Sequence, residues 1–222
     1  MAGFKGQNNI INAKKHANKR EVITLDISHC FPNTKAKYIK RFFESCGAKG
    51  EILDILLKLT TYKDYLPTGA PTSTLLLAFA HKDIFDFIYN KMQRNNVDMT
   101  IYVDDITLST HEHMSNSVIK YVNKVLKQHA LWLKKSKTKR YGYRHAEVTG
   151  VHIAQNGKLS APFSIGYSVV QKLREKEIKD MDLKELRGII AKIGYLQQFN
   201  NKTMQTTKIK AIKQLRKLEK TN

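Results

Sequence analysis

The stretch TIYVDDITLS, residues 100–109, places two adjacent aspartates, Asp104 and Asp105, between two apolar and β-branched arms. The arms predict two strands that are joined by a tight turn. Carboxylates are costly to bury unless they are paired or hold a metal. Because aspartate is also common in ordinary turns, the stretch alone leaves two interpretations open, a polar turn and a cation site.

A third acid, Asp26, ends another predicted strand that covers Glu21–Ile27. If this strand pairs with the hairpin, Asp26 and Asp104 converge at one end of a sheet. Oxygen ligands in such a place suit Mg²⁺, which keeps several waters and takes one or two carboxylates plus substrate phosphates. Two such ions about 3.5–4 Å apart hold the attacking and leaving oxygens of a phosphoryl displacement. The three acids therefore favour a cation site that serves a nucleotide.

The composition describes a folded and strongly basic chain. Its 222 residues are 41% hydrophobic, which suits one or two domains with a real core. Lys and Arg number 39 against 19 Asp and Glu, so the net charge is +20. A charge of this size favours nucleic acid as the partner, with an anionic membrane surface second. The longest apolar run, LLLAFA, is too short to span a bilayer, and the N-terminal sequence lacks the apolar core of a signal peptide.

Two cysteines, Cys30 and Cys46, have no ligand spacing, and we expect both to be buried thiols in a reducing cytoplasm. Further along the chain, periodicity and breakers predict the elements. Asn33 or Thr34 is expected to cap the first of the helices. The expected elements, in chain order, are helices at 35–46 and 49–60, a loop at 60–74, one buried apolar helix to about 91, a helix at 114–129, and a hairpin at 146–161 that turns at Asn156–Gly157.

The chain from Ser164 onward is expected to be helical throughout, with Asp182 as a helix cap. Beyond Asn201 the sequence is basic, and it predicts an amphipathic helix whose apolar residues recur every three positions, namely Ile209, Ile212, Leu215 and Leu218. The order of elements predicts an α+β core that is followed by a helical module.

Taken together, these residues resemble a reverse transcriptase, through an ordered series of motifs that covers nearly the whole chain. The motifs are LDISHCFP (25–32), LPTGAPTS (66–73), YVDD (102–105), KKSKT (134–138) and VTGV (148–151). Two further signatures narrow the resemblance to the bacterial retron reverse transcriptases. These are NAKKH, from Asn12 to His16, and VTG, from Val148 to Gly150.

The resemblance implies a role for each matching residue. Asp26, Asp104 and Asp105 would be catalytic, and together with the carbonyl of Ile27 they would bind two Mg²⁺ ions, for which Mn²⁺ could substitute. The residues implied in nucleotide binding are Phe31 as an aromatic gate against the ribose 2′-OH, Pro67, Thr68, Gly69 and Lys137. Those implied in primer or RNA binding are Tyr102, Asn12, His16, Val148, Thr149 and Gly150, the glycine serving either a close approach of the backbone or a bulge.

The resemblance also implies a fold and an activity. The fold is a polymerase palm, an α+β right-hand architecture with an antiparallel sheet and packed helices. Residues 1–162 would form the palm with a remnant of the fingers, and residues 163–222 a helical thumb that ends in a basic helix. The activity is RNA-directed synthesis of DNA from dNTPs on a structured noncoding RNA. It would serve antiphage defence with an effector protein, in the cytoplasm and away from membranes.

Some features depart from the family pattern. Thr68 stands where related enzymes often have Gln, Thr74 where they often have Pro, and Val103 where retron enzymes more often have Ala. As a β-branched residue, Val103 is expected to suit a strand. The substantial fingers segment that usually precedes GFKGQNNI is not present in this sequence, which puts activity in doubt more than fold.

Alternative functions remain. One is another bacterial reverse transcriptase, either group II intron-like or defence-associated. A second is an RNA-templated RNA polymerase, against which Phe31 and the retron signatures argue. The third is a catalytically silent palm that binds RNA as a scaffold. The three intact acids argue against this scaffold, because an inactive site has no reason to keep buried carboxylates, whereas the missing fingers segment favours it.

Overall fold

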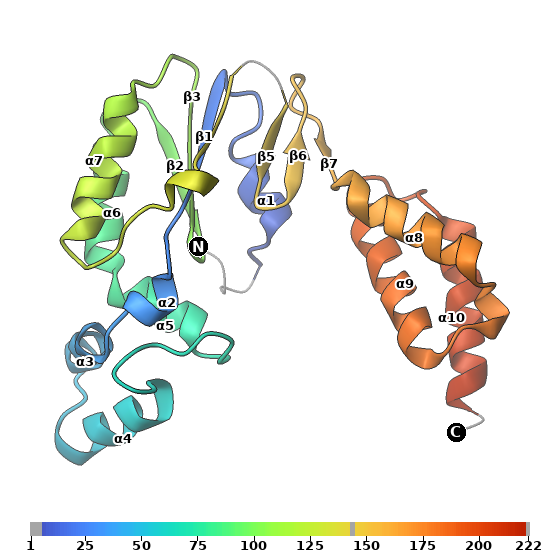
Figure 1. The fold of residues 1–222 in the computed structure, drawn as a ribbon, viewed down its shortest axis with the longest axis horizontal. Helices are drawn as coiled ribbons and strands as arrows, with labels where there is room; N and C mark the ends of the chain where they lie inside the picture. The colour runs from blue at the N-terminus through green and yellow to red at the C-terminus, as the bar shows by residue number, and fades with distance from the viewer. Residues whose placement is uncertain (1–5, 143–144, 221–222) are drawn as a thin grey trace.

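The computed structural model describes residues 6–142 and 145–220. Its central layer is an antiparallel sheet in the order β2-β3-β1-β4 (Figure 1). The strands of this sheet are β1 (Glu21–Asp26), β2 (Asp98–Tyr102), β3 (Asp105–Thr110) and β4 (Lys139–Tyr141). The first three were predicted from the sequence, whereas β4 was not, because its short basic segment KRY has no apolar alternation.

Two helices, α6 (Lys82–Gln93) and α7 (Asn116–Lys127), cover one face of this sheet (Figure 1). Alternate residues of the strands, such as Ile23 and Leu108, are fully buried against apolar side chains of the two helices, such as Ile88. Each buried aliphatic side chain stabilises the fold by about 1.5–3 kcal/mol relative to exposure. This core fixes the sheet from which the acids project.

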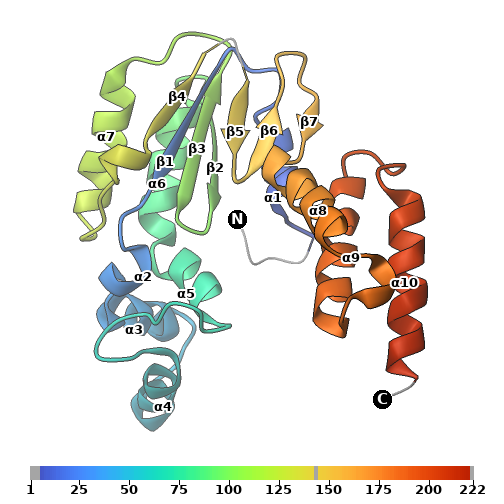
Figure 2. The same ribbon diagram turned by 45° about the vertical axis from the view of Figure 1, so that its right-hand side comes forward.

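Four helices lie beyond the C-terminal end of β1 (Figures 1 and 2). They are α2 (Cys30–Asn33), α3 (Ala36–Ser45), α4 (Gly50–Thr60) and α5 (Ser73–Ala80). The two predicted helices at 35–46 and 49–60 are thus confirmed. The predicted cap is wrong, because Lys35 occupies the cap of α3 without a side-chain bond. The Thr34 hydroxyl instead donates to the Cys30 carbonyl at 2.8 Å.

The single apolar helix that was expected up to residue 91 is also wrong, because the chain leaves helical geometry at His81, between α5 and α6. The His81 side chain is buried, with its Nε2 2.9 Å from the Thr34 hydroxyl. This contact anchors the break to the segment before α3. The expected burial also fails at Phe87, whose side chain is 59% exposed.

A second sheet in the order β5-β6-β7 stands beside the first (Figure 2). It consists of β5 (Ala146–Val148), β6 (Val151–Ile153) and β7 (Leu159–Ser160). The predicted hairpin is therefore a three-stranded unit with an additional tight turn at Thr149–Gly150. Both residues of that turn have positive φ, 48° and 73°, so Gly150 serves a turn and not a bulge. The helix α1 (Asn9–Lys14) packs against this sheet.

The C-terminal part is a separate three-helix unit to the side of the sheets (Figure 1). It comprises α8 (Phe163–Glu175), α9 (Leu183–Gln197) and α10 (Gln205–Glu219), with a short 3₁₀ turn at Ile178–Asp180. Another 3₁₀ turn, at Lys135–Lys137, lies before β4. Asp182 caps α9, as predicted, and it also forms a reciprocal capping box with Glu185. In α10, Leu215 and Leu218 pack against the core of this unit as predicted. Ile209 departs from the predicted stripe, because it is 59% exposed, whereas Ala211 is fully buried.

Within residues 6–142 and 145–220, no helix is long and apolar enough to cross a membrane. The two cysteines differ in environment, since Cys30 is buried and Cys46 is exposed. The expectation of two buried thiols is therefore wrong for Cys46, which follows directly after α3 at the molecular surface.

Candidate active site

Strand pairing brings the three acids to one end of the first sheet. β1 and β3 run antiparallel, and their register places Asp26 directly opposite Asp105. Beyond this pair, the Ile27 amide donates to the Asp104 carbonyl at 2.9 Å. This bond ties the end of β1 to the turn of the β2–β3 hairpin. The convergence that the sequence suggested is thus present in the structure.

The turn that carries Asp104 has an unusual backbone. Val103 has a φ of 59°, in the left-handed region that a β-branched residue rarely adopts. The prediction that Val103 suits a strand is therefore wrong, because the residue lies in the turn between β2 and β3. Such a conformation costs on the order of 1–3 kcal/mol and persists only where the surroundings enforce it. The strain is stored directly beside the two acids.

A cavity of about 440 Å³ opens at this end of the sheet. It brings together residues from β1, β3, β4 and the turn of the second sheet. The predicted site residues that line it are Asp26, Asp104, Asp105, Lys137, Thr149 and Gly150. Other residues on its wall, which the sequence did not single out, are Thr24, Thr107, Lys139, Tyr141 and Glu147. The cavity thus joins the acids to the Thr149–Gly150 turn across the two sheets.

The acids in this cavity are electrostatically unbalanced. Burial, followed by the neighbouring charges of Asp104 and Asp26, raises the pKa of Asp105 to about 6. Burial also raises the pKa of Asp104. Lys137 supplies a cation, with its Nζ 2.7 Å from Asp26 Oδ2, and this hydrogen bond raises the pKa of Lys137. Elsewhere on the wall Lys139 pairs with Glu147 at 3.7 Å. Lys137 is therefore left beside the three aspartates, and the site carries excess negative charge.

The donor set suits a hard cation. Its ligands are carboxylate oxygens, which Mg²⁺ and Mn²⁺ prefer. In the part of the chain that the structure describes, no three His, Cys, Asp or Glu side chains are grouped to hold an ion by themselves. An ion here therefore needs additional oxygens from water or a substrate phosphate, as is usual for Mg²⁺. The excess of negative charge and the oxygen donors fit such a partly completed site.

Other predicted nucleotide-binding residues lie outside this cavity. Phe31, in α2, is half-buried against the core of the first sheet. Pro67, Thr68 and Gly69 form the loop before α5, where the Ser73 hydroxyl donates to the Pro67 carbonyl at 2.6 Å. Both α2 and α5 lie beyond the C-terminal end of β1 (Figure 1), and Asp26 is the last residue of that strand.

The residues expected to bind primer or RNA divide into two groups. Thr149 and Gly150 line the acid cavity, and Tyr102 lines a separate cavity of about 240 Å³ together with Asn12. Val148 is fully buried in the core of the second sheet. Its side chain therefore lies inside the protein, and its expected part in primer or RNA binding stays a prediction.

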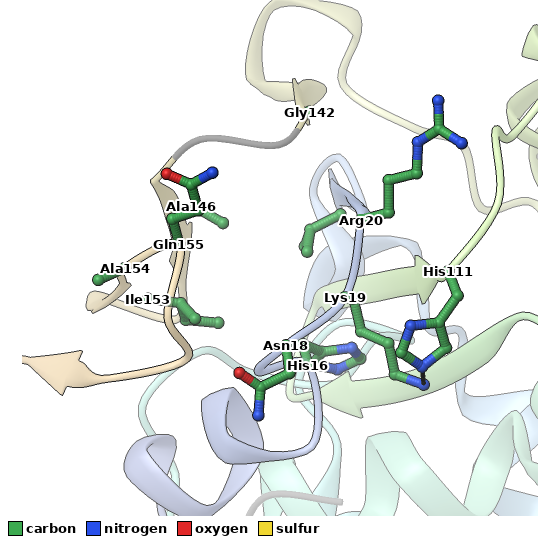
Figure 3. A pocket seen from close by; sticks show the side chains of 11 residues that line it. His16, Asn18, Lys19, Arg20, His111, Gly142, Ala146, Ile153, Ala154 and Gln155 are labelled. Atoms are coloured by element: carbon green, nitrogen blue, oxygen red, sulfur yellow. Dashed lines mark hydrogen bonds between the residues drawn. The ribbon is translucent and has the colours of Figure 1, made fainter.

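His16 is also enclosed by the protein, and its expected part in RNA binding likewise stays a prediction. Its side chain is fully buried, with Nδ1 2.7 Å from the Ser109 hydroxyl and Nε2 2.7 Å from the Thr100 hydroxyl. Burial lowers its pKa to about 4, so the ring is neutral at pH 7. Figure 3 shows His16 beside another cavity of about 440 Å³, at the opposite end of the sheet, which has no carboxylate among its described lining residues.

The sequence did not predict two structural features. Glu21, at the start of β1, is buried and bonded to Arg140 and to the Met114 amide. Asn9 links α1 to Thr149 and to Tyr195 through its side-chain amide. A glutamate at the start of a β-prone strand was the one available signal for the first feature, and nothing local marked the second.

Comparison with known proteins places this geometry in a family. The family model described as reverse transcriptase (RNA-dependent DNA polymerase) matches residues 1–153. The chain belongs to the reverse transcriptase family. Similar curated reverse transcriptases include those of retrons Ec48 and Ec86 from Escherichia coli, each 28% identical, over 130 and 158 residues. The reverse transcriptase of retron Se72 from Salmonella heidelberg (strain 579083-10) is 28% identical over 138 residues.

These alignments cover part of each chain. They include 57%, 69% and 60% of this reverse transcriptase chain against 32%, 49% and 36% of the Ec48, Ec86 and Se72 proteins, respectively. This chain therefore spans between about a third and a half of the length of those relatives. A solved structure of telomerase from Candida albicans, in complex with a fragment of telomeric RNA, matches with a TM-score of 0.52 at 10% identity. It covers 87% of this chain and 40% of the telomerase chain, which supports the palm-and-thumb fold alone.

Proposed function

We propose that this chain catalyses RNA-directed DNA synthesis of the retron type, copying a structured noncoding RNA into DNA. The observation that carries the proposal is the convergence of Asp26, Asp104 and Asp105 with Lys137 in one cavity. Similarity to three retron reverse transcriptases supports the retron assignment. Residues 1–162 are then the palm with a remnant of the fingers, and residues 163–222 are the thumb.

The acids are assigned to the metal site of this reaction. Asp26 and Asp104 provide carboxylate ligands, Asp105 supports them, and the Ile27 carbonyl adds a ligand beside Asp26. Two Mg²⁺ ions bound there would activate the primer 3′-hydroxyl and neutralise the triphosphate, and Mn²⁺ would be a substitute. The raised pKa of Asp105 reflects a site that is destabilised until a cation arrives.

Lys137 is assigned two successive partners. Without substrate its ammonium pairs with Asp26 at 2.7 Å, although its side chain is 56% exposed. An exposed lysine is free to exchange this partner for a phosphate at little cost. We therefore assign Lys137 to the triphosphate or the pyrophosphate product once Asp26 is engaged with cations.

The remaining contacts surround the nascent base pair. Phe31 is assigned as the gate against the ribose 2′-OH, and the loop Pro67–Gly69 to the incoming dNTP. The Thr149–Gly150 turn is assigned to the primer end, because it lines the same cavity as the acids. Tyr102 ends the strand that leads into the catalytic turn, and it is assigned to the primer side of this site.

The net charge of +20 supports a polyanionic partner. Basic residues such as Lys213 and Lys217 on α10 suit the phosphates of a duplex that is held by the thumb. Binding of RNA should weaken steeply with salt, because each neutralised phosphate releases counterions. By analogy with retrons we also assign an antiphage role in the cytoplasm, together with an effector protein.

Primer extension on an RNA template tests this function. The wild-type protein is incubated with dNTPs and Mg²⁺ beside a double variant, Asp104→Asn with Asp105→Asn. A matched control is Asp180→Asn, which neutralises an exposed aspartate of the thumb. We expect the wild type and the control to extend the primer and the double variant to lose extension. EDTA should stop the reaction, and added Mg²⁺ or Mn²⁺ should restore it.

Two other results have clear meanings. Extension that survives in the double variant would refute the assigned metal site. In the other result, every protein binds RNA in a salt-sensitive way but none extends the primer, even when the RNA that copurifies from the host is the template. This result would favour the RNA scaffold over the polymerase.

A further inference from the structure

The short helix α1 contacts three parts of the molecule that are far apart in the sequence. It lies beside the second sheet and near the thumb helices in Figure 2. The same segment carries the NAKKH signature, Asn12 to His16. Because His16 is buried and Asn12 is nearly so, the contacts of these residues within the protein indicate what the segment does.

Its first contact is with the catalytic hairpin. The His16 ring lies between the Thr100 hydroxyl on β2 and the Ser109 hydroxyl on β3, at 2.7 Å from each. β2 leads into the turn that holds Asp104, and β3 begins at Asp105. His16 therefore fixes the end of α1 to the base of the catalytic hairpin.

Its second contact is with the turn of the second sheet. Asn12 Nδ2 donates to the Thr149 hydroxyl at 3.4 Å, and this hydroxyl is 3.3 Å from the Asn9 carbonyl. Asn9 Nδ2 also donates to the Thr149 carbonyl at 3.3 Å. Three hydrogen bonds thus hold Thr149, a residue that lines the acid cavity.

Its third contact is with the thumb. Asn9 Nδ2 donates to the Tyr195 hydroxyl of α9 at 2.9 Å. An amide nitrogen has two hydrogens, so one Asn9 side chain bonds the Thr149–Gly150 turn and the thumb together. Phe199, which follows α9 and packs edge-on to Tyr195 at 5.4 Å, adds an apolar contact with the cluster that contains Ala13.

We propose that α1 is the joint that sets the thumb against the palm, with Asn9 as its positioning residue. Through Asn9, the orientation of the thumb on a bound duplex is coupled to the Thr149–Gly150 turn beside the acids. The joint should therefore govern how long a duplex stays in register and not the chemical step itself. This inference rests on the proposed function for its kinetic consequence, but the geometry it describes is independent of catalysis.

The kinetic test uses Tyr195→Phe, which removes one hydroxyl and retains the ring that packs on Phe199. The control is Tyr167→Phe, whose hydroxyl contacts Gln171 within α8 alone among its described hydrogen bonds. With a trap that captures dissociated protein, we expect Tyr195→Phe to add at least three-fold fewer nucleotides per binding event than the wild type. The rate of the first addition should stay within two-fold of the wild type, and the control should match the wild type in both.

A spectroscopic test separates the joint from the polymerase activity. In a Cys46→Ser background, in which Cys30 stays buried, spin labels are placed at the exposed positions Lys124 of α7 and Lys213 of α10. The distribution of distances between the labels is measured by pulsed electron–electron double resonance. Asn9→Ala and Tyr195→Phe should broaden or shift this distribution, whereas Tyr167→Phe should leave it unchanged.

The outcomes of the two tests are distinct. Unchanged label distances in both joint variants would overturn the inference, whatever the activity. Altered distances in a folded protein whose wild type makes no DNA would support the joint and refute the proposed function. A parallel loss of first addition and of thermal stability in Tyr195→Phe would show a merely structural contact and overturn the positioning role.

Discussion

The two ends of β1 carry acids with opposite surroundings. Glu21, at the start, has a side chain that is 7% exposed and accepts hydrogen bonds from Arg140 and from the Met114 amide, with His113 Nδ1 3.0 Å away. Asp26, at the end, has a side chain that is 12% exposed and pairs with a lysine that is largely in solvent. Both acids belong to the same strand and both side chains are largely buried, yet only Glu21 is surrounded by hydrogen-bond donors.

This difference separates stability from function on one short strand. A buried carboxylate that is fully paired contributes to the fold, and removing one partner leaves an uncompensated charge. A cluster of carboxylates with too few partners instead costs stability and suits a ligand that brings positive charge. The surroundings of each acid, and not its burial, therefore tell the two roles apart.

The largest expected effect is the loss of activity in Asp26→Asn. Removing a carboxylate of the proposed metal site should lower the rate of nucleotide addition on the order of a thousandfold, which corresponds to about 4 kcal/mol of transition-state stabilisation. The melting temperature in EDTA should stay the same or rise, because the change relieves repulsion from Asp104 and Asp105. Single-turnover incorporation and thermal unfolding by circular dichroism measure the two quantities. A melting temperature that fell with the activity would contradict the comparison.

The next largest effect is a loss of stability without a loss of activity when Glu21, at the start of β1, is replaced. Glu21→Gln should destabilise the protein by about 2–3 kcal/mol, less than for a fully buried pair, because the Arg140 side chain is 29% exposed. The rate of nucleotide addition by the folded protein should change by less than a few-fold, since the acid cavity is at the opposite end. Urea unfolding measures the loss of stability.

The matched control for this change is Glu219→Gln. Glu219 pairs with Arg187 at 2.8 Å, but both side chains are exposed, so its loss should cost less than about 0.5 kcal/mol. Equal destabilisation by Glu21→Gln and Glu219→Gln would remove the distinction between the two kinds of carboxylate.

Sequence patterns predicted what short-range physics determines. The apolar arms around Asp104 predicted the hairpin, the acidic cap predicted α9, and the convergence of Asp26 with Asp104 followed from one assumed strand pairing. The partner of Glu21 could not be predicted, since Arg140 lies 119 positions away and its strand has no periodicity. The burial of His16 depends likewise on Ser109, 93 positions away.

Local propensity was overridden in two places. At Val103 the requirement for a two-residue turn placed a β-branched side chain at a φ of 59°. At His81 a buried contact with Thr34 accompanies the break in a run whose composition favours one continuous helix. The turn was evident from the sequence around Val103, but the contact of His81 with Thr34 spans 47 positions and lies outside any local window.

The smallest predicted effect concerns pH and has opposite signs at the two ends of the hairpin. The pKa of His16 is lowered from 6.5 to about 4 by burial, so the unfolded chain takes up the proton first as the pH falls. This group therefore removes stability between pH 6.5 and 4. The pKa of Asp105 is raised from 3.8 to about 6, so the folded chain takes up that proton first, and stability rises as the pH falls through 6.

Two variants measured in EDTA resolve these opposing contributions. His16→Gln, which retains a donor and an acceptor, should flatten the fall in the free energy of unfolding between pH 7 and pH 5 by about 1–2 kcal/mol. Asp105→Asn should steepen the same fall by a smaller amount, because Asp105 is partly exposed to solvent. His81, whose pKa burial also lowers to about 4, contributes with the sign of His16 in both variants. If both variants flattened the pH dependence of the free energy of unfolding, His16 at the base of the hairpin and Asp105 at its tip would not have the opposite effects predicted here.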